Sequence, residues 1–214
     1  MVGRKKGWLT YRGKFAALKS NGTVLWKSTV VRDYLYLLEH DKDVLTYENC
    51  PLEVHYTYAG ESHVLTPELR VRRKDSLQLV KIVSGREQTD GTEGLHLPAG
   101  LSSVEAHDLR ILTESEVRQQ PFLNNIKALW RYARVPVEVP QYQLLCHDFF
   151  RGQGCVSLGE LTEFFTRHHL PAAQVFALIF HGMLSVDMTV PLTRRSPVNY
   201  TGARTALKIR SIER

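Results

Sequence analysis

The chain is poor in the residues that build disulfide frameworks and structural zinc sites. Its 214 residues include three cysteines, Cys50, Cys146 and Cys155, which form no CxxC pair and no ligand-spaced cluster with the nine histidines. A disulfide scaffold or a structural zinc site is therefore not expected, and the cysteine content fits a reducing compartment.

Long apolar runs are also missing from the sequence. It contains no stretch of 18 apolar residues that could span a bilayer, and its first residues, MVGRKKGW, lack the apolar segment and cleavage site of a signal peptide. We therefore expect a cytoplasmic protein without a membrane partner.

Acidic residues are fewer than basic ones. The 22 Asp and Glu against 28 Lys and Arg give a formal charge of +6, while 43% hydrophobic and 23% charged residues are typical of a folded globular protein. This excess of positive charge is compatible with a polyanionic partner but does not identify one.

Basic and aromatic residues alternate over residues 1–20. The basic side chains include Arg4, Lys5, Lys6 and Arg12, and Phe15 is one of the aromatic residues between them. One interpretation is an N-terminal arm that binds DNA phosphates while its aromatic residues pack on the body. The other is a solvated terminus followed by a first strand or helix.

Residues 21–112 have the pattern of a mixed α/β unit. Ser28 is a predicted N-cap for an amphipathic helix that ends near His40. Strands are predicted at residues 44–47, 52–58, 64–72, 77–83 and 109–112. Turns are expected at residues 58–61 and 74–76.

Residues 113–214 have a helical pattern that begins at a capping box, Thr113 with Glu116. Pro121 opens a second helix, and a third is expected at residues 142–150. A second capping box, Ser157 with Glu160, then opens a helix, which is followed by a turn at residues 169–171, a helix ending at Gly182 and a strand at residues 184–188. This order predicts a winged-helix-like domain.

The second helix of that predicted module lacks the residues that read DNA bases. Residues 172–181 contain no Arg or Lys, and their polar side chains are Gln174 and His181. Base recognition in the major groove usually needs Arg, Lys, Asn or Gln. The composition favours a role in packing or in protein docking.

Six segments, in order, resemble the TnsA family, the endonuclease subunit of heteromeric transposases. They are STVVRDYLYLLEHD (28–41), VLTYENCP (44–51), HYTYAGESHVLTPELRV (55–71), QLVKIV (78–83), LRILTESEVRQQPFLNNIKALWRYAR (109–134), and SLGEL (157–161) with VFALIFHGMLSVDMTVPL (175–192). The resemblance implies a bacterial protein with a restriction-endonuclease-like mixed sheet flanked by helices, followed by a mainly α winged-helix-like domain.

The metal-binding positions of that family are poorly matched. Its helix glutamate falls on Val31, its proline-linked aspartate on Glu68, its strand acid on Leu79 and its lysine on Lys81. Such nucleases hold Mg²⁺ through carboxylates, and Val31 and Leu79 offer no oxygen ligand. We expect Glu68 and Lys81 to be catalytic remnants, with Glu68 a weak metal ligand at most.

Four other side chains are candidate substitutes for the lost ligands. Asp33 and Glu39 lie on the same predicted helix as Val31, although Asp33 is about 200° around its axis. Glu48 and His63 come from nearby segments. For each, the alternative is a solvated surface charge.

Basic residues gather around the second predicted hairpin and near the C-terminus. The residues that we predict to contact DNA phosphates, besides those of residues 1–20, are Arg70, Arg72, Arg73, Lys74, Arg194, Arg195, Arg204, Lys208 and Arg210. The alternative is that these charges form a solvated face.

Three functions remain open on the sequence. The first is a non-catalytic TnsA-like subunit that needs no cofactor and binds transposon-end DNA together with a DDE transposase (TnsB-like) and an AAA+ ATPase regulator (TnsC-like), the partners that the resemblance implies. The second is an active Mg²⁺-dependent endonuclease with a rearranged site that cuts transposon 5′ ends. The third is a bridging module without DNA affinity.

Overall fold

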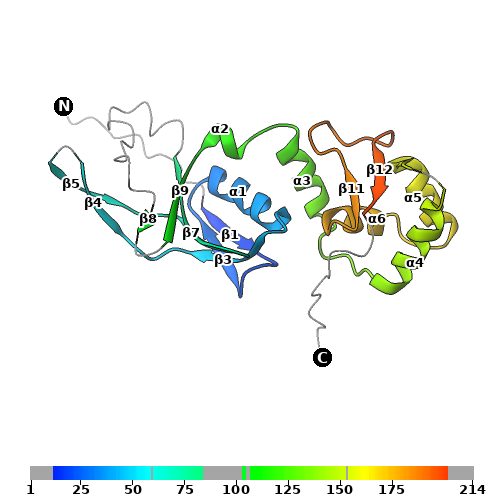
Figure 1. Ribbon diagram of the computed structural model, residues 1–214, viewed down its shortest axis with the longest axis horizontal. Coiled ribbons are helices and arrows are strands. Elements are labelled where there is room, and N and C mark those ends of the chain that lie inside the picture. The colour runs from blue at the N-terminus through cyan, green and yellow to red at the C-terminus, as the bar shows by residue number, and fades with distance from the viewer. Residues whose placement is uncertain (1–11, 59, 84–102, 105–106, 153, 202–214) are drawn as a thin grey trace, which may run out of the picture. The chain divides into compact units, whose positions relative to one another are not determined.

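The computed structural model describes residues 12–58, 60–83, 103–104, 107–152 and 154–201 (Figure 1). The chain forms two compact units, residues 1–119 and 120–214, which are considered separately below. Both helices and a mixed sheet are present, as expected for an α/β protein. No helix in these described ranges has the length and apolar character needed to cross a membrane.

The first unit is built on a five-stranded mixed sheet with strand order β3-β6-β7-β9-β8. The strands are β3 (Val44–Asn49), β6 (Leu69–Arg73), β7 (Leu77–Val83), β8 (Ser103–Val104) and β9 (His107–Thr113). Neighbouring strands are antiparallel except β7 and β9, which are parallel. The predicted turn at residues 74–76 is confirmed, because the Arg73 N–H donates to the Ser76 carbonyl across 2.8 Å.

Helix α1 (Thr29–His40) covers the sheet (Figure 1). The predicted N-cap is confirmed, since the Ser28 hydroxyl accepts the Val31 N–H. The apolar stripe of the helix contributes Leu35 and Leu38 to the core, and both side chains are fully buried. Burial of this stripe, more than helix propensity, stabilises α1 in its place.

A first hairpin, β1 (Gly13–Ala16) with β2 (Thr23–Trp26), precedes α1. Phe15 is buried, and the described residues 12–20 include strand β1, so the expectation of a first strand in this region is confirmed. Residue 13 faces the Trp26 ring so closely that a Cβ atom there would lie 2.6 Å from it, which explains Gly13. Arg4, Lys5 and Lys6 lie outside the described residues.

A second hairpin, β4 (Val54–Tyr58) with β5 (Glu61–Leu65), extends from the sheet (Figure 1). The prediction of one strand over residues 64–72 was wrong, because the chain leaves β5 at Leu65 and enters β6 at Leu69. Pro67 lies in the break, where its missing N–H removes a ladder hydrogen bond. The break frees the segment before Leu69 to turn toward the main sheet.

The first unit extends past residue 112. Helix α2 (Glu114–Val117) follows β9 directly and begins with the predicted capping box of Thr113 and Glu116. Arg118 then ties this end of the unit to α1, with its Nε 2.9 Å from Asp33 Oδ2 and its Nη2 2.8 Å from Thr29 Oγ1.

In its described residues the second unit combines four helices with a small antiparallel sheet of strand order β10-β12-β11. In chain order its elements are α3 (Phe122–Trp130), α4 (Val139–Phe150), β10 (Val156–Ser157), α5 (Leu158–Arg167), α6 (Ala173–Phe180), β11 (Leu184–Val186) and β12 (Pro197–Tyr200). Pro121 is the residue before α3, as predicted, and the Ser157–Glu160 capping box is present.

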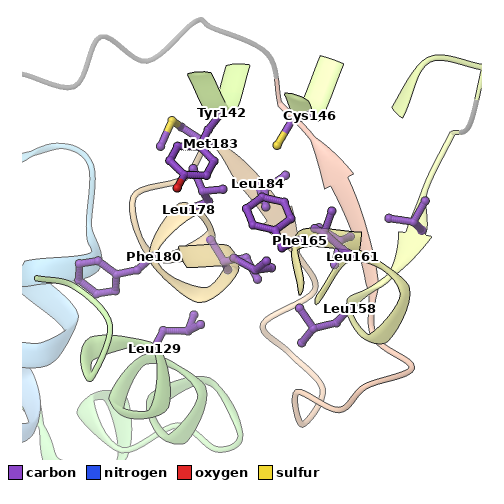
Figure 2. Packing of buried hydrophobic residues seen from close by; sticks show 14 of the residues in the cluster. Leu129, Tyr142, Cys146, Leu158, Leu161, Phe165, Leu178, Phe180, Met183 and Leu184 are labelled. Carbon is purple, nitrogen blue, oxygen red and sulfur yellow. The ribbon is translucent and has the colours of Figure 1, made fainter. Parts of the chain in front are cut away.

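The core of the second unit is aromatic and aliphatic (Figure 2). Leu161, Phe165 and Leu178 are buried at its centre, and the Tyr142 ring stacks on Phe165 with centroids 5.8 Å apart. Most of α6 is buried, which agrees with a packing role for this helix rather than base recognition.

Candidate functional site

A cleft of about 320 Å³ opens in the first unit at the junction of several elements. Its lining comes from the end of β2, α1, the end of β3, the β5–β6 connection and β7, and consists of Leu25, Lys27, Val31, Asn49, Cys50, Thr66, Pro67, Glu68 and Lys81. Three of the four positions that the sequence pointed to, Val31, Glu68 and Lys81, therefore share one cleft.

Glu68 and Lys81 form an ion pair inside this cleft. The Lys81 Nζ lies 2.8 Å from Glu68 Oε1, and the Ile82 N–H donates to Glu68 Oε2 at 2.8 Å. The two side chains are 20% and 17% exposed. Both carboxylate oxygens of Glu68 are thus bonded by the chain itself.

The backbone of Glu68 explains why its side chain points at Lys81. Its N–H donates to the Val80 carbonyl at 2.8 Å, and its own carbonyl accepts the Cys50 N–H at 3.1 Å. Because Leu69 and Val80 are register partners on antiparallel strands, Glu68 and Lys81 come next in the ladder and share a face.

Hydrocarbon occupies the other two positions that the sequence resemblance pointed to. Val31 borders the cleft and is 4% exposed, while Leu79 is 1% exposed and packs in a cluster with Cys50, Val54 and Leu65. Leu79 therefore joins the root of the β4–β5 hairpin to the sheet. A carboxylate there would lose this packing and its solvation at once.

The two α1 candidates for substitute ligands lie elsewhere, and the alternative that they are solvated surface charges is wrong for both. Asp33 is 4% exposed and binds Arg118, as described above. Glu39 is 3% exposed, and its Oε1 accepts the Leu18 N–H at 2.7 Å and the Tyr47 hydroxyl at 2.6 Å. Both carboxylates are covered by segments distant in sequence, which α1 alone cannot reveal.

Glu48 and His63 do not reach the cleft either. Glu48 is exposed and accepts Arg70 Nε at 2.8 Å, while the His63 ring stacks on Tyr56 with centroids 5.3 Å apart. Within the described ranges, no group of three or more His, Cys, Asp or Glu side chains is placed to hold a metal ion.

The basic residues at the β6–β7 turn are bonded to acids of the α1–β3 connection. Arg73 Nη1 lies 2.7 Å from Asp41 Oδ2, and its Nε donates to Gln78 Oε1 at 2.8 Å. Lys74 Nζ lies 2.6 Å from Asp43 Oδ1. Two of the predicted DNA contacts therefore hold this end of the first unit together.

The other predicted DNA contacts fall into three groups. Arg70 is ion-paired with Glu48, and Arg194 with Glu163, whose Oε1 lies 2.7 Å from Arg194 Nη2. Arg12, Arg72 and Arg195 are exposed and, among the residues described, form no ion pair. Arg204, Lys208 and Arg210 lie outside the described residues.

Two titratable groups at the C-terminal end of α1 were missed in the sequence. Lys19 Nζ donates to the carbonyls of Leu38 and Asp41, the first at 2.9 Å, and burial lowers the pKa of Lys19 to about 8. Burial, reinforced by the charges of Lys19 and Lys42, lowers the pKa of His40 to about 4. No local sequence signal marks them, because Lys19 lies in the β1–β2 connection and meets the end of α1 only in the folded chain.

No family model matches the chain, and no curated protein matches it. The resemblance to the TnsA family therefore depends on the segments quoted above.

Proposed function

We propose that this protein is a TnsA-like subunit of a bacterial DNA transposition complex that binds transposon-end DNA and no longer cleaves it. The observation that carries the proposal is the state of the cleft. Among its described lining residues, Glu68 is the one carboxylate, and both of its oxygens are bonded to Lys81 and Ile82.

The proposed lack of cleavage follows from the coordination chemistry of Mg²⁺. This ion requires near-octahedral oxygen coordination and uses carboxylates to fix its place beside the substrate phosphate. Only then can it activate water and stabilise the leaving oxygen. Val31 and Leu79 supply no oxygen, so the residues present do not fit a catalytic Mg²⁺ site.

The architecture of each unit supports the finer fold proposals. A restriction-endonuclease-like fold is supported by a helix packed on a mixed sheet, with β7 parallel to β9 and an acid and a lysine at the start of β6 and on β7. A winged-helix-like second unit is supported by two successive helices, α5 and α6, followed by the antiparallel strands β11 and β12.

DNA binding is supported by cations that have no acidic partner. Lys27 lines the cleft, and Arg72 and Arg195 are exposed on the first and second unit, all without an ion pair within the described part of the chain. Contacts of this kind bind phosphates regardless of base sequence and weaken as salt displaces them.

The test is a plasmid-nicking assay with Mg²⁺ or Mn²⁺, run beside a salt titration of duplex binding. We expect no nicking by the wild type or by Glu68→Ala, and binding that falls steeply with salt. Nicking by the wild type that Glu68→Ala abolishes would establish an active nuclease instead. A chain that binds no duplex even at low salt would be the bridging module.

The transposition context has its own test. We expect the chain to co-purify with the DDE transposase and the AAA+ regulator of its element when the three are expressed together. If the chain co-purified with neither protein, it would not be a subunit of a transposition complex, and DNA binding alone would remain of the proposed function.

A further inference from the structure

We infer that the Glu68 carboxylate occupies the place of a phosphate group in the cleft and thereby limits the affinity of this site for the DNA backbone. The inference rests on the proposed function for the source of the phosphate, a phosphodiester of DNA. It assigns Glu68 a role as an internal competitor of the ligand rather than as a metal ligand.

The first support is the geometry of the donors around this carboxylate. An ammonium, Lys81 Nζ, and a backbone amide, Ile82 N–H, converge on its two oxygens, each at 2.8 Å. Ammonium groups and backbone N–H groups are the donors that bind phosphate oxygens in proteins. The donor pair is therefore suited to any anion with two adjacent oxygens.

The second support is the position of the pair. Both side chains line the cleft and are partly exposed, so an incoming phosphate can reach the donors without unfolding the sheet. Asn49 also lines the cleft, but its amide is committed to the backbone of Leu25, donating at 2.7 Å and accepting at 2.8 Å. The Asn49 amide is therefore not counted among the donors for a phosphate.

The third support is the charge of the cleft. Among its described lining residues the charged ones are Lys27, Lys81 and Glu68, which give a net charge of +1, that is two positive charges less one negative charge. Neutralising Glu68 raises this charge to +2 and frees Lys81. Lys27 is exposed and, in the described part of the chain, unpaired, so it is the second cation available to a phosphate.

This inference and a metal-ligand role for Glu68 predict changes of opposite sign. A carboxylate that competes with phosphate weakens DNA binding, so Glu68→Gln should strengthen it. A carboxylate that holds Mg²⁺ against phosphate strengthens binding, so the same substitution should weaken it whenever Mg²⁺ is present. The glutamine keeps the size of the side chain, so the fold is undisturbed. Its neutral oxygen binds Lys81 and the Ile82 N–H more weakly than the carboxylate does, so a phosphate can displace it.

The experiment is fluorescence anisotropy of a labelled DNA duplex, at several salt concentrations and with either EDTA or Mg²⁺. We expect Glu68→Gln to bind about threefold to tenfold more tightly than the wild type, with or without Mg²⁺, and to gain about one unit of salt dependence. In a Glu68→Gln background, Lys27→Met should remove most of this gain.

A matched control separates the cleft from total charge. Glu61→Gln adds the same charge at an exposed position on the β4–β5 hairpin, and it should change affinity less than twofold. Thermal melting of each variant checks that it is folded. Unchanged or weaker binding by folded Glu68→Gln, or an equal gain with Glu61→Gln, would overturn the inference.

A second readout keeps the inference distinct from the proposed function. Inorganic phosphate is titrated into Glu68→Gln while the Ile82 amide signal is followed by NMR. If no variant binds duplex but phosphate shifts this amide in Glu68→Gln more than in the wild type, DNA binding is wrong and the phosphate site stands. If phosphate leaves the amide unmoved and no variant binds duplex, both are wrong.

Discussion

The charged residues at the two ends of β6 differ in whether their ion pairs border an open cleft. At its start, Glu68 and Lys81 form an ion pair that borders an open cleft. At its end, Arg73 and Lys74 bind Asp41 and Asp43 of the α1–β3 connection. The comparison teaches that a basic cluster in a sequence can consist of residues paired with acids of the same unit. A single acid and lysine can instead mark the cleft that a ligand can reach.

The strand order explains the difference. Because β3 pairs antiparallel with β6, Val44 lies opposite Arg73, and the acids just before β3 meet the turn just after β6. At the other end β5 leaves toward its own hairpin partner, so the β5–β6 connection borders a cleft instead of an acidic segment.

The largest effect is expected from placing an acid at Leu79, near the cleft end of β6. Leu79→Glu should lower the free energy of unfolding by about 3–5 kcal/mol, because it removes packed hydrocarbon and buries an unpaired carboxylate. Urea denaturation measures this loss. We expect no compensating stabilisation on adding Mg²⁺, since Glu68 is engaged by Lys81.

Leu45→Glu is the control for that substitution. Leu45 is also on a strand of the sheet but is 48% exposed, so its replacement should cost less than about 1 kcal/mol. If Leu79→Glu were as stable as Leu45→Glu and gained stability with Mg²⁺, the cleft would be a dormant metal site and not a hydrocarbon-filled one.

An intermediate effect on stability is expected from lowering the pH. The group concerned is His40, which lies beside Asp41 at the end of β6 where Arg73 and Lys74 are ion-paired. His40 has a pKa near 4 in the folded protein because of burial, against about 6.5 in the unfolded chain. Between these values the unfolded state binds more protons, so stability falls as the pH is lowered from 6.5 toward 4. We expect a loss of about 1–3 kcal/mol, measured by urea denaturation at pH 7 and pH 5.

His40→Gln isolates this contribution, because glutamine does not titrate. The variant should show a smaller change in stability between pH 7 and pH 5 than the wild type. An identical change in unfolding free energy in both proteins would mean that His40 is freely protonated in the folded state. The end of α1 around His40 would then be more open to solvent than its contacts indicate.

Local sequence signals predicted much of the secondary structure. The caps at Ser28, Thr113 and Ser157 and the turn at residues 74–76 depend on neighbouring residues, and all are present. The boundary errors were also local. Residues 64–72 read as one strand, although Pro67 divides β5 from β6.

The pairing of Glu68 with Lys81 was predictable because the two residues are close in the sheet, whereas Val31 was assigned to the site through the family resemblance alone. Glu68 directly precedes β6 and Lys81 lies on β7, so the prediction of a β6–β7 hairpin brings them together. Asp33 and Arg118 are 85 residues apart, and Glu39 is 21 residues from Leu18. Which of the charged residues are covered depends on such long-range packing, and no alternation pattern encodes it.

The smallest effects compare Arg73 with its neighbour Arg72. Arg73→Met should lower the free energy of unfolding by about 1–2 kcal/mol, because Asp41 and Gln78 lose a partly buried partner. Its effect on DNA affinity should be small. Arg72→Met, at an exposed position, should change stability by less than about 0.5 kcal/mol and weaken duplex binding about threefold.

The two measurements for this pair are urea denaturation and duplex anisotropy at one salt concentration. The same substitution on adjacent residues keeps the change in net charge constant, so any difference between the variants arises from position. If Arg73→Met weakened DNA binding as much as Arg72→Met while leaving stability unchanged, the ion pair with Asp41 would open on DNA. The end of β6 at Arg73 would then be part of the DNA-binding surface, and the two ends of the strand would not differ in accessibility to DNA.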